Sequence, residues 1–301
     1  MTTKIKKLIT HDGSFHTDDV LAAAALSIYL EQQDENFEII RTRDAEMIKS
    51  GDYVFDVGGI YDAELNKFDH HQKDGAGKRE NGLAYSSFGL VWHKFGKAVA
   101  GNEPAAIRLE QKLVMPVDAI DNGIDLSVNN FPDILAYTLE NVLAIFAPTA
   151  LEGLEKDQQF LKALVWAKEI LQREIKKAND QIQITKIIQS FYAKAADKRL
   201  IVIDAPKVSR HEIWEALQDF AEPLFIVYGD KEDWSVVAMR KEKNSFGNRK
   251  NFPATWAALR ASELRNLTKV ADAIFCHNNL FLSVAKSKEG AVKLAQIAIE
   301  S

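Results

Sequence analysis

Four clusters of aspartate and histidine lie in the first half of this 301-residue chain. They are His11-Asp12-Gly13-Ser14-Phe15-His16-Thr17-Asp18-Asp19, Asp56-Val57-Gly58-Gly59, Asp69-His70-His71-Gln72 and Asp118-Ala119-Ile120-Asp121-Asn122-Gly123. The first two follow short apolar runs that read as strands, and side chains at strand ends are held rigidly at one edge of a sheet. Because the clusters contain no Cys, they suit two hard or borderline divalent cations, a pair that most often hydrolyses phosphate esters.

The first cluster lies between a predicted strand and a predicted helix, and a loop there lets His11, His16 and Asp18 converge. Imidazole together with carboxylate favours Mn, Fe, Co or Zn, whereas carboxylates alone would favour Mg. Asp56 precedes a Val-Gly-Gly segment whose glycines allow a ligand to approach the backbone closely. Asp56 is therefore the candidate for a carboxylate that bridges two metal ions.

The remaining clusters leave several roles open. His70 and His71 are adjacent, so their side chains should diverge, one toward a metal and the other toward substrate phosphate or another ligand. Asp121 precedes an Asn-Gly turn signal, and Asp118 could share a helical face with it, so either could complete the site. Asp19 is either a ligand or a first-turn acid that caps a helix. Each cluster alone is more often structural, but four together disfavour a wholly structural reading.

Strand-like and helix-like segments alternate in the first half of the chain, which predicts an α/β fold with a parallel sheet flanked by helices. We expect strands at 4–10, 37–42 and 52–57, and helices at 18–32, 45–49, 86–95, 104–115 and 133–146. The stretch 155–196 contains neither Pro nor Gly and reads as one long connecting helix with at most one break. Such a helix packs between domains or forms a dimer seam, so a homodimer stays open.

A second alternating region follows and predicts a smaller α/β domain. Its expected strands are 199–204, 223–228, 234–240, 273–276 and 280–285, and its expected helices are 211–220, 255–265 and 288–299. We therefore expect a metal-binding catalytic domain at 1–150, a helical connection at 151–197 and a substrate-binding domain at 198–301.

Composition limits the protein's surroundings and partners. The net charge of −5 does not favour tight, sequence-blind binding of nucleic acid. No apolar run reaches the ~18 residues of a membrane-spanning helix. A single cysteine, Cys276, and the lack of a secretory signal fit a cytoplasmic protein.

The clusters resemble a known family. Asp69-His70-His71 is the motif of the DHH phosphoesterase superfamily, and the wider pattern resembles its MYG1 branch (UPF0160). The matching stretches are 10–19, 56–62, 68–72, 119–123 and 245–250, followed by Pro253, Trp256 and Leu259-Arg260, so the resemblance covers nearly the whole chain. In two places the chain departs from the pattern. His16 replaces the first of two aspartates, and Asn278-Asn279-Leu280-Phe281 stands where a glycine-bearing segment is expected to contact substrate.

The resemblance implies a DHH-type N-terminal domain, a smaller C-terminal domain, a site in the cleft, and manganese or a similar ion. Eukaryotic members are described as 3′-to-5′ RNA exonucleases, while other branches cleave pyrophosphate, cyclic dinucleotides or short oligonucleotides. The leading hypothesis is thus a metal-dependent phosphoesterase on RNA or short oligonucleotides. A hydrolase of small phosphate compounds and a non-catalytic metal-binding scaffold are the alternatives.

The corresponding mechanism assigns a role to each candidate residue. One ion would be held by His11, His16 and Asp56. The other would be held by Asp18, Asp56, His70 and either Asp121 or Asp118. A water between the ions would attack phosphorus while His71 stabilises the phosphoryl oxygens.

The second domain would supply further substrate contacts. Arg249 and Lys250 would clamp a flanking phosphate. Phe246 and Trp256 would either stack on a base or pack in the C-terminal core.

Overall fold

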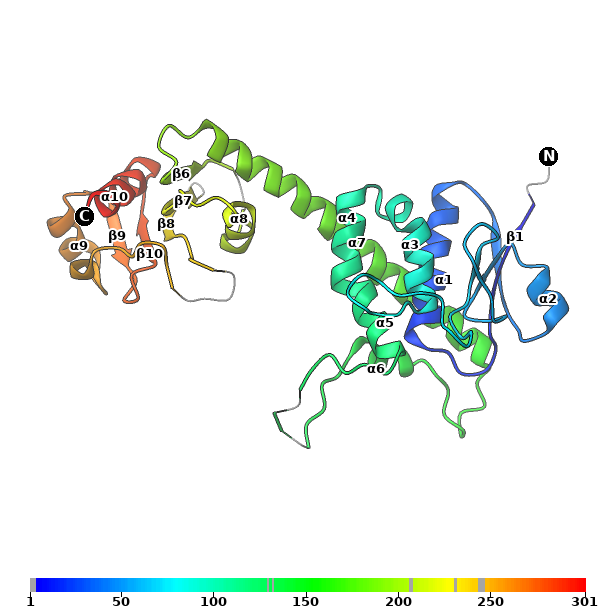
Figure 1. Cartoon of the computed structure of the whole chain (residues 1–301). Helices are drawn as coiled ribbons and strands as arrows, with labels where there is room; N and C mark the ends of the chain where they lie inside the picture. Colours follow the sequence, from blue (N-terminus) through cyan, green and yellow to red (C-terminus); the bar gives the residue numbers. More distant parts are fainter. Residues whose placement is uncertain (1–3, 129, 132, 206–207, 230–231, 243–246) are drawn as a thin grey trace. The chain divides into compact units, whose positions relative to one another are not determined.

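Short apolar strands form the centre of each of two units, Met1–Asn179 and Asp180–Ser301. The computed structural model describes residues 4–128, 130–131, 133–205, 208–229, 232–242 and 247–301. Each unit holds a five-stranded sheet with helices packed on it (Figure 1). The predicted α/β class is confirmed.

The sheet of the first unit is parallel except at one edge. Its strands are β1 (Lys6–Thr10), β2 (Phe37–Arg41), β3 (Tyr53–Phe55), β4 (Tyr61–Asp62) and β5 (Lys67–Phe68). They run in the order β2-β1-β3-β5-β4, and only β4 is antiparallel to its neighbour. The strands β4 and β5 were not predicted, because two residues are too few to show a period. The carboxyl ends of β1, β3 and β5 consequently share one edge of the sheet.

Helices cover both faces of this sheet. They include α1 (Thr17–Gln32), α2 (Ala45–Lys49) and α3 (Ser87–Ala100). On one face, the Phe95 ring of α3 lies 5.9 Å from Tyr53 and 5.8 Å from Phe68. On the other face, Ile48 of α2 packs against Ile9 and Val54. Sheet and helices together therefore enclose the hydrophobic core of the unit.

The helix α1 is buried on nearly every side, unlike the amphipathic surface helices of most proteins. Its four consecutive alanines, Ala22 to Ala25, have no exposed surface. Side chains this small allow α3 to approach closely, and α1 also contacts α5 (Met115–Asp121) and α6 (Leu139–Ala144). The amino end of α1, which carries acidic residues, is therefore fixed by packing along the whole helix.

Two expected helices in this unit have different bounds. The helix expected at 104–115 runs through α4 (Glu103–Leu109), a π-helical turn η1 (Glu110–Val114) and then α5, as far as Asp121. The helix expected at 133–146 is limited to α6. Its start is set by Thr138, whose hydroxyl accepts from the Asn141 N–H while the Asn141 side chain accepts from the Thr138 N–H.

The long helix α7 (Lys156–Lys194) is continuous, without the break that was allowed for. The division between the units falls within it, after Asn179. Its first part buries Phe160, Leu164 and Leu171 in the first unit, and Ile188 packs in a core cluster of the second. Among the described residues, no helix has both the length and the apolar character needed to cross a membrane.

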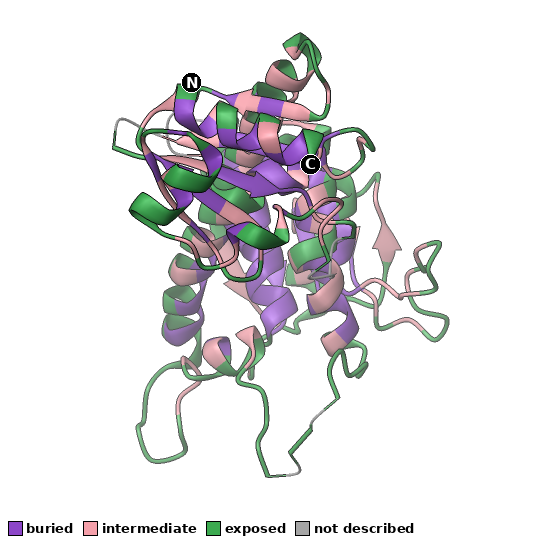
Figure 2. Cartoon of the chain, turned by 90° about the vertical axis from the view of Figure 1, so that its left-hand side faces the viewer, coloured by how far each residue is buried: buried purple, intermediate pink, exposed green. Residues whose placement is uncertain are grey.

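The sheet of the second unit is mostly antiparallel. Its strands are β6 (Leu200–Ile203), β7 (Phe225–Gly229), β8 (Trp234–Ala238), β9 (Ala273–Cys276) and β10 (Leu282–Ala285), in the order β6-β7-β8-β10-β9. The helix α8 (Arg210–Leu217) and the end of α7 pack on one face, and α9 (Ala261–Thr268) and α10 (Lys288–Glu300) belong to the core of the other. Figure 2 shows burial concentrated in the helices and strands, with exposed loops around them.

The helix expected at 255–265 is not formed as one piece. A 3-10 turn, η2 (Ala254–Trp256), precedes α9, and the backbone between them is interrupted. Ala258 has a positive φ angle of 62°, which the interior of a right-handed helix does not contain. The segment therefore turns before α9 begins.

Two leucines of α7 provide a matched test of how the first part of this helix packs in the first unit. Leu171 has no exposed surface, whereas Leu161 on the same helix is 48% exposed. We expect Leu171→Ala to lower the free energy of unfolding by about 2 to 5 kcal/mol, because it leaves a cavity. The control Leu161→Ala should cost less than about 1 kcal/mol. Urea unfolding monitored by circular dichroism measures both, and equal losses would contradict the assigned burial.

Candidate metal centre

The carboxyl ends of three parallel strands bring the predicted clusters together. His11 follows β1, Asp56 follows β3, and His70 and His71 follow β5. The His11 Nε2 atom lies 3.1 Å from Asp56 Oδ2, and the His70 Nε2 atom lies 3.4 Å from Asp56 Oδ1. Residues nearly 60 positions apart in the sequence thus meet at one carboxylate.

Asp56 has a backbone conformation that few side chains adopt. Its φ of 55° lies in the left-handed region, which Asp and Asn tolerate better than other non-glycine residues. This conformation ends β3 abruptly. The Ser87 hydroxyl donates to Asp56 Oδ1 at 3.2 Å and helps to fix the buried carboxylate. Because its two oxygens face different imidazoles, Asp56 has the arrangement expected of a carboxylate that bridges two ions.

Within the described part of the chain, three groups of side chains present atoms that could hold a metal ion. They are His11, His16 and Asp56; Asp56, His70 and His71; and Asp18, His70 and Asp121. Within each group, the ligand atoms lie within 4.8 Å of one another. Asp56 belongs to two groups and His70 to two, so the groups form one continuous centre. Of the two aspartates left open at the end of α5, Asp121 lies in this centre.

The donor set fits divalent cations. Asp18 is 1% exposed, and neither of its carboxylate oxygens has a hydrogen-bond partner among the described residues. Burial of an unpartnered carboxylate is costly, and a cation would relieve that cost. Neutral imidazoles mixed with carboxylates suit Mn, Fe, Co or Zn.

Burial and neighbouring groups together leave the pKa of Asp18 and of His11 raised but that of Asp56 lowered. Burial, and then the negative charge of Asp56, raises the pKa of Asp18 well above its ordinary value. Burial also acts on Asp56, but hydrogen bonds from His11 and His70 outweigh it and lower the pKa of Asp56. Burial would lower the pKa of His11, yet hydrogen bonds to Asp19 and Asp56 raise it to about 10. Protons on the imidazoles therefore offset the carboxylate charge where no cation does.

Of the two roles that its sequence position left open, Asp19 has that of a helix cap. Its Oδ1 accepts a hydrogen bond from the His16 N–H at 2.9 Å, which caps the amino end of α1. Its Oδ2 lies 3.3 Å from His11 Nε2. Asp19 therefore positions two candidate ligands, although it belongs to none of the three groups.

Asp118 faces away from the candidate ligands. Its Oδ2 lies 2.7 Å from Arg79 Nη1, and its Oδ1 accepts from the Ser86 hydroxyl at 2.6 Å. Arg79 also pairs with Glu110 at 2.6 Å. This buried network ties the loop after His71 to the helices η1 and α5. The structure thus gives Asp118 a tethering position beside the centre, outside the three groups.

Asp69 was quoted as part of a motif but not chosen as a functional residue. Its Oδ2 accepts from the Gly59 N–H at 2.5 Å, and its Oδ1 lies 2.8 Å from His71 Nδ1. A buried carboxylate on Nδ1 fixes the ring and leaves Nε2 for a ligand. The position of Asp69 two residues before His71 was the available signal.

Arg41 was not anticipated at all. Its side chain is 3% exposed, donates to the Gly13 carbonyl at 3.0 Å and pairs with Asp157 at 2.6 Å. Its guanidinium also lies 5.6 Å from the Phe15 ring and 4.7 Å from the Phe160 ring. Arg41 thereby anchors the loop that carries His11 and His16. No sequence signal pointed to it, because an arginine at the end of a strand has no pattern of its own.

Two cavities adjoin the centre within the first unit. One of about 710 Å³ is polar and includes Arg43, Gly58 and Gly59 in its lining. The other, of about 360 Å³, adds the apolar Val117 and Leu139. Both are lined by His16, Asp56 and His71, so the two cavities adjoin at the centre.

The residues expected to clamp a phosphate make internal contacts in the second unit. Arg249 donates through all three guanidinium nitrogens to the carbonyls of Gln218, Phe220, Pro223 and Arg240. Lys250 Nζ donates to the Ile299 carbonyl at 2.8 Å. A phosphate contact by either side chain would require these hydrogen bonds to be exchanged.

Of the two aromatic residues considered for stacking on a base, one can be placed. Trp256 is 3% exposed and lies 5.7 Å from Phe252 in the core, which matches the packing alternative. Phe246 lies outside the described residues.

Comparison with known proteins places this chain in a family. The model of the MYG1 exonuclease family, described as an uncharacterised protein family (UPF0160), matches residues 7–299. A MYG1 protein of Chlamydia trachomatis is 29% identical over 295 residues, covering 97% of this chain and 96% of that protein. The MYG1 exonuclease of Homo sapiens is 28% identical over 324 residues, covering 96% and 85%. A crystal structure of exonuclease RecJ bound to manganese is 14% identical with a TM-score of 0.30, covering 98% and 91%.

Metal binding at this centre should release protons. Below pH about 10, the His11 imidazole carries a proton that a metal must displace, so metal affinity should rise with pH. We expect Mn²⁺ affinity to increase by about tenfold or more per pH unit between about pH 6 and pH 8. Calorimetry in buffers of different ionisation enthalpy measures the protons released.

A histidine outside the centre provides the control. His93 is exposed on α3, so His93→Gln should leave affinity and proton release unchanged. His11→Gln should weaken Mn²⁺ binding and reduce the number of protons released. A pH-independent affinity in the unsubstituted protein would contradict the assignment.

Proposed function

Because the chain belongs to the MYG1 exonuclease family (UPF0160), we propose that its metal centre hydrolyses phosphodiester bonds of RNA or short oligonucleotides, proceeding 3′ to 5′. The observation that carries this proposal is the shared carboxylate of Asp56, which joins two groups of potential metal ligands. The human relative is named an exonuclease. Such a chemistry requires that a phosphate be held beside activated water, and this centre offers both a cation site and adjoining cavities.

Two divalent cations fit the proposed centre. His11, His16 and Asp56 would hold one, and Asp18, Asp56, His70 and Asp121 would hold the other. When bound, the ions would lower the pKa of water and neutralise phosphate charge. Mn²⁺ is the first choice, and the same donors also accept Fe²⁺, Co²⁺ or Zn²⁺.

His71 serves the substrate in this proposal. Its side chain is 62% exposed, in contrast to the buried His11. The hydrogen bond to Asp69 holds the ring in place, so Nε2 can contact a phosphoryl oxygen without a loss of rotational freedom on binding. His71 thus positions the phosphate rather than the metal.

The two cavities suggest how a nucleotide lies across the centre. Arg43 lines the polar cavity, is 66% exposed and pairs with Asp12 at 3.3 Å. An exposed pair of this kind exchanges readily for a phosphate. Val117, Ile120 and Leu139 line the smaller cavity and offer an apolar surface for a ribose or base. The substrate would therefore place its next phosphate near Arg43.

Substitution of Asp56 by asparagine tests the proposal without disturbing the backbone, because Asn also tolerates the φ of 55°. With Mn²⁺ and a 5′-labelled RNA, the unsubstituted protein should produce a descending ladder, and a 3′-labelled RNA should lose its label first. Asp56→Asn should reduce kcat by at least about 100-fold.

The matched control is Asp74→Asn, an exposed aspartate three residues after His71, which should leave kcat unchanged. Full activity of Asp56→Asn would refute the shared carboxylate. Cleavage of pyrophosphate or cyclic dinucleotides, with RNA left intact, would instead indicate a hydrolase of small phosphate compounds. Metal binding without any turnover would indicate a scaffold.

His71→Gln separates a substrate contact from a metal ligand. We expect a fall in kcat of about 100-fold, because the phosphoryl oxygens lose a positioned partner, while Mn²⁺ affinity stays within about twofold. His70→Gln is the comparison and should weaken Mn²⁺ binding itself. Calorimetry and single-turnover kinetics measure the two effects, and a large loss of Mn²⁺ affinity in His71→Gln would assign that residue to the metal.

A further inference from the structure

Large apolar side chains are exposed around the start of α7, in the first unit. In the loop that leads into this helix, Leu151 is 97% exposed and Leu154 is exposed as well. On the helix itself, Leu161 is exposed and Val165 is 69% exposed. Figure 1 shows the loop between α6 and α7 extending away from the helices. Exposed apolar side chains that gather in this way mark an interaction surface.

The exposed side of α7 extends this surface along the helix. Phe160 and Leu171 are buried on the side of α7 that faces the first unit. We call the opposite side, between residues 155 and 176, the outer face of α7. A groove of about 650 Å³ lies on this face, and all of its lining residues belong to α7. The ring of Trp166, at one end of the groove, lies 6.2 Å from the Phe146 ring.

Two charges on the outer face of α7 have no use within the first unit. Lys162 and Glu169 form no ion pair with any described residue, whereas Lys168, beside them, pairs with Glu31 of α1. Lys162 and Glu169 are seven residues apart, which is two helical turns. They therefore share one side of the helix but lie about 10 Å apart along its axis, too far to pair with each other. Both are available to a partner of complementary charge.

The outer face of α7 is complementary to itself. If two copies of α7 lie antiparallel with the centre between Val165 and Trp166, each residue faces the one equally far beyond the centre on the other copy. Lys162 then faces Glu169 of the second copy, and Glu169 faces Lys162 of the second copy. Each match occurs twice, once on either side of the centre, as in a symmetric dimer.

The rest of this overlap is complementary too. With the same centre, Glu155 faces Lys176 of the second copy, and Leu161 faces Ile170 of the second copy. Apolar side chains thus meet in the middle, and opposite charges meet toward both ends. The overlap of residues 155–176 is about 33 Å long, or about three heptads, which is a length typical of paired helices.

The charge of the adjoining segment limits the class of partner. Residues 122–155 include five aspartates and glutamates but no Lys, Arg or His. RNA and anionic lipid surfaces would be repelled by such a segment, because both carry phosphate charge. A protein surface that is apolar and basic suits it better. The outer face of α7 offers such a surface, since Arg173, Lys176 and Lys177 follow its apolar part.

We propose that two copies of this chain associate through the outer face of α7, antiparallel and symmetric about the point between Val165 and Trp166. The apolar residues exclude water from the middle of the contact, and the ion pairs fix its orientation and register. The contact lies within the first unit and involves none of the candidate metal ligands. It therefore stands whether or not the chain hydrolyses RNA.

Sedimentation velocity on the full chain, over about a hundredfold range of concentration, measures this association. We expect a dimer that dissociates on dilution. Val165→Glu should raise its dissociation constant by about 100-fold, because two carboxylates would meet in the apolar middle of the contact. The matched control is Ile187→Glu, at an exposed position of the same helix outside residues 155–176, which should leave the dissociation constant unchanged. Circular dichroism checks that both variants keep their helix content.

Exchange of charge between copies tests the orientation. Lys162→Glu alone and Glu169→Lys alone should each weaken association by about tenfold or more, because like charges then meet twice in each dimer. When the two variants are mixed in equal amounts, they should form a heterodimer of the original affinity, since each new residue meets an opposite charge. Lys186→Glu, an exposed position farther along α7, is the control and should have no effect.

Several results would overturn this proposal. They are a chain that stays monomeric at every concentration, a dimer that Val165→Glu leaves intact, and single charge variants that associate as the unsubstituted chain does. Failure of the mixed variants to associate would equally exclude the antiparallel register. Asp56→Asn should form the dimer with full affinity, so a failure of this contact and a failure of the hydrolytic centre give different results.

Discussion

One buried carboxylate, that of Asp56, organises the first unit. Its two oxygens face the imidazoles of His11 and His70 at 3.1 and 3.4 Å, and its backbone turns sharply at a φ of 55°. This contact requires β1, β3 and β5 to end at one edge of the sheet, and the parallel order of the strands provides that edge. A slip of one residue in β3 would turn the carboxylate to the opposite face. The chemistry of the centre therefore depends on strand register.

The surrounding packing sustains a cluster of charges that would otherwise be unfavourable. Four aspartates, Asp18, Asp19, Asp56 and Asp121, lie around two imidazoles, and burial raises the pKa of three of them. The closely packed α1 and the anchoring Arg41 hold the ligands in place against mutual repulsion. Such a cluster is a reason for a cation to bind.

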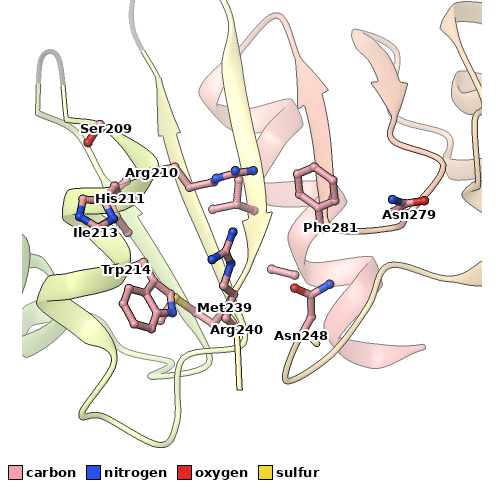
Figure 3. Close-up of a pocket in the computed structure, with 12 residues that line it drawn as sticks. Ser209, Arg210, His211, Ile213, Trp214, Met239, Arg240, Asn248, Asn279 and Phe281 are labelled. Carbon is pink, nitrogen blue, oxygen red and sulfur yellow. The ribbon is translucent and has the colours of Figure 1, made fainter. Parts of the chain in front are cut away.

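The second unit is also built from a five-stranded sheet with helices packed on it. Its sheet is largely antiparallel, its core fills both faces, and a cavity beside α8 is lined by basic, aromatic and apolar side chains (Figure 3). Arg249 and Trp256, for which the sequence left a ligand contact open, donate to carbonyls and pack in the core. Arg210, which carried no motif, lines the cavity beside α8 together with Phe281. Residue type alone could not separate these pairs, because an arginine can serve either a backbone carbonyl or a phosphate.

The sequence by itself determined the α/β class, the positions of most strands and helices, and the four Asp/His clusters, because these follow from local periodicity and from residue chemistry. It could not find β4 and β5, which are too short for a period, nor the tethers Arg41 and Arg79. Only the tertiary structure distinguished Asp121 from Asp118 as the candidate metal ligand. The two residues are three positions apart on α5, and once this helix is packed Asp121 lies among the candidate ligands whereas Asp118 pairs with Arg79. Local patterns determine which elements form, whereas packing decides which atoms meet.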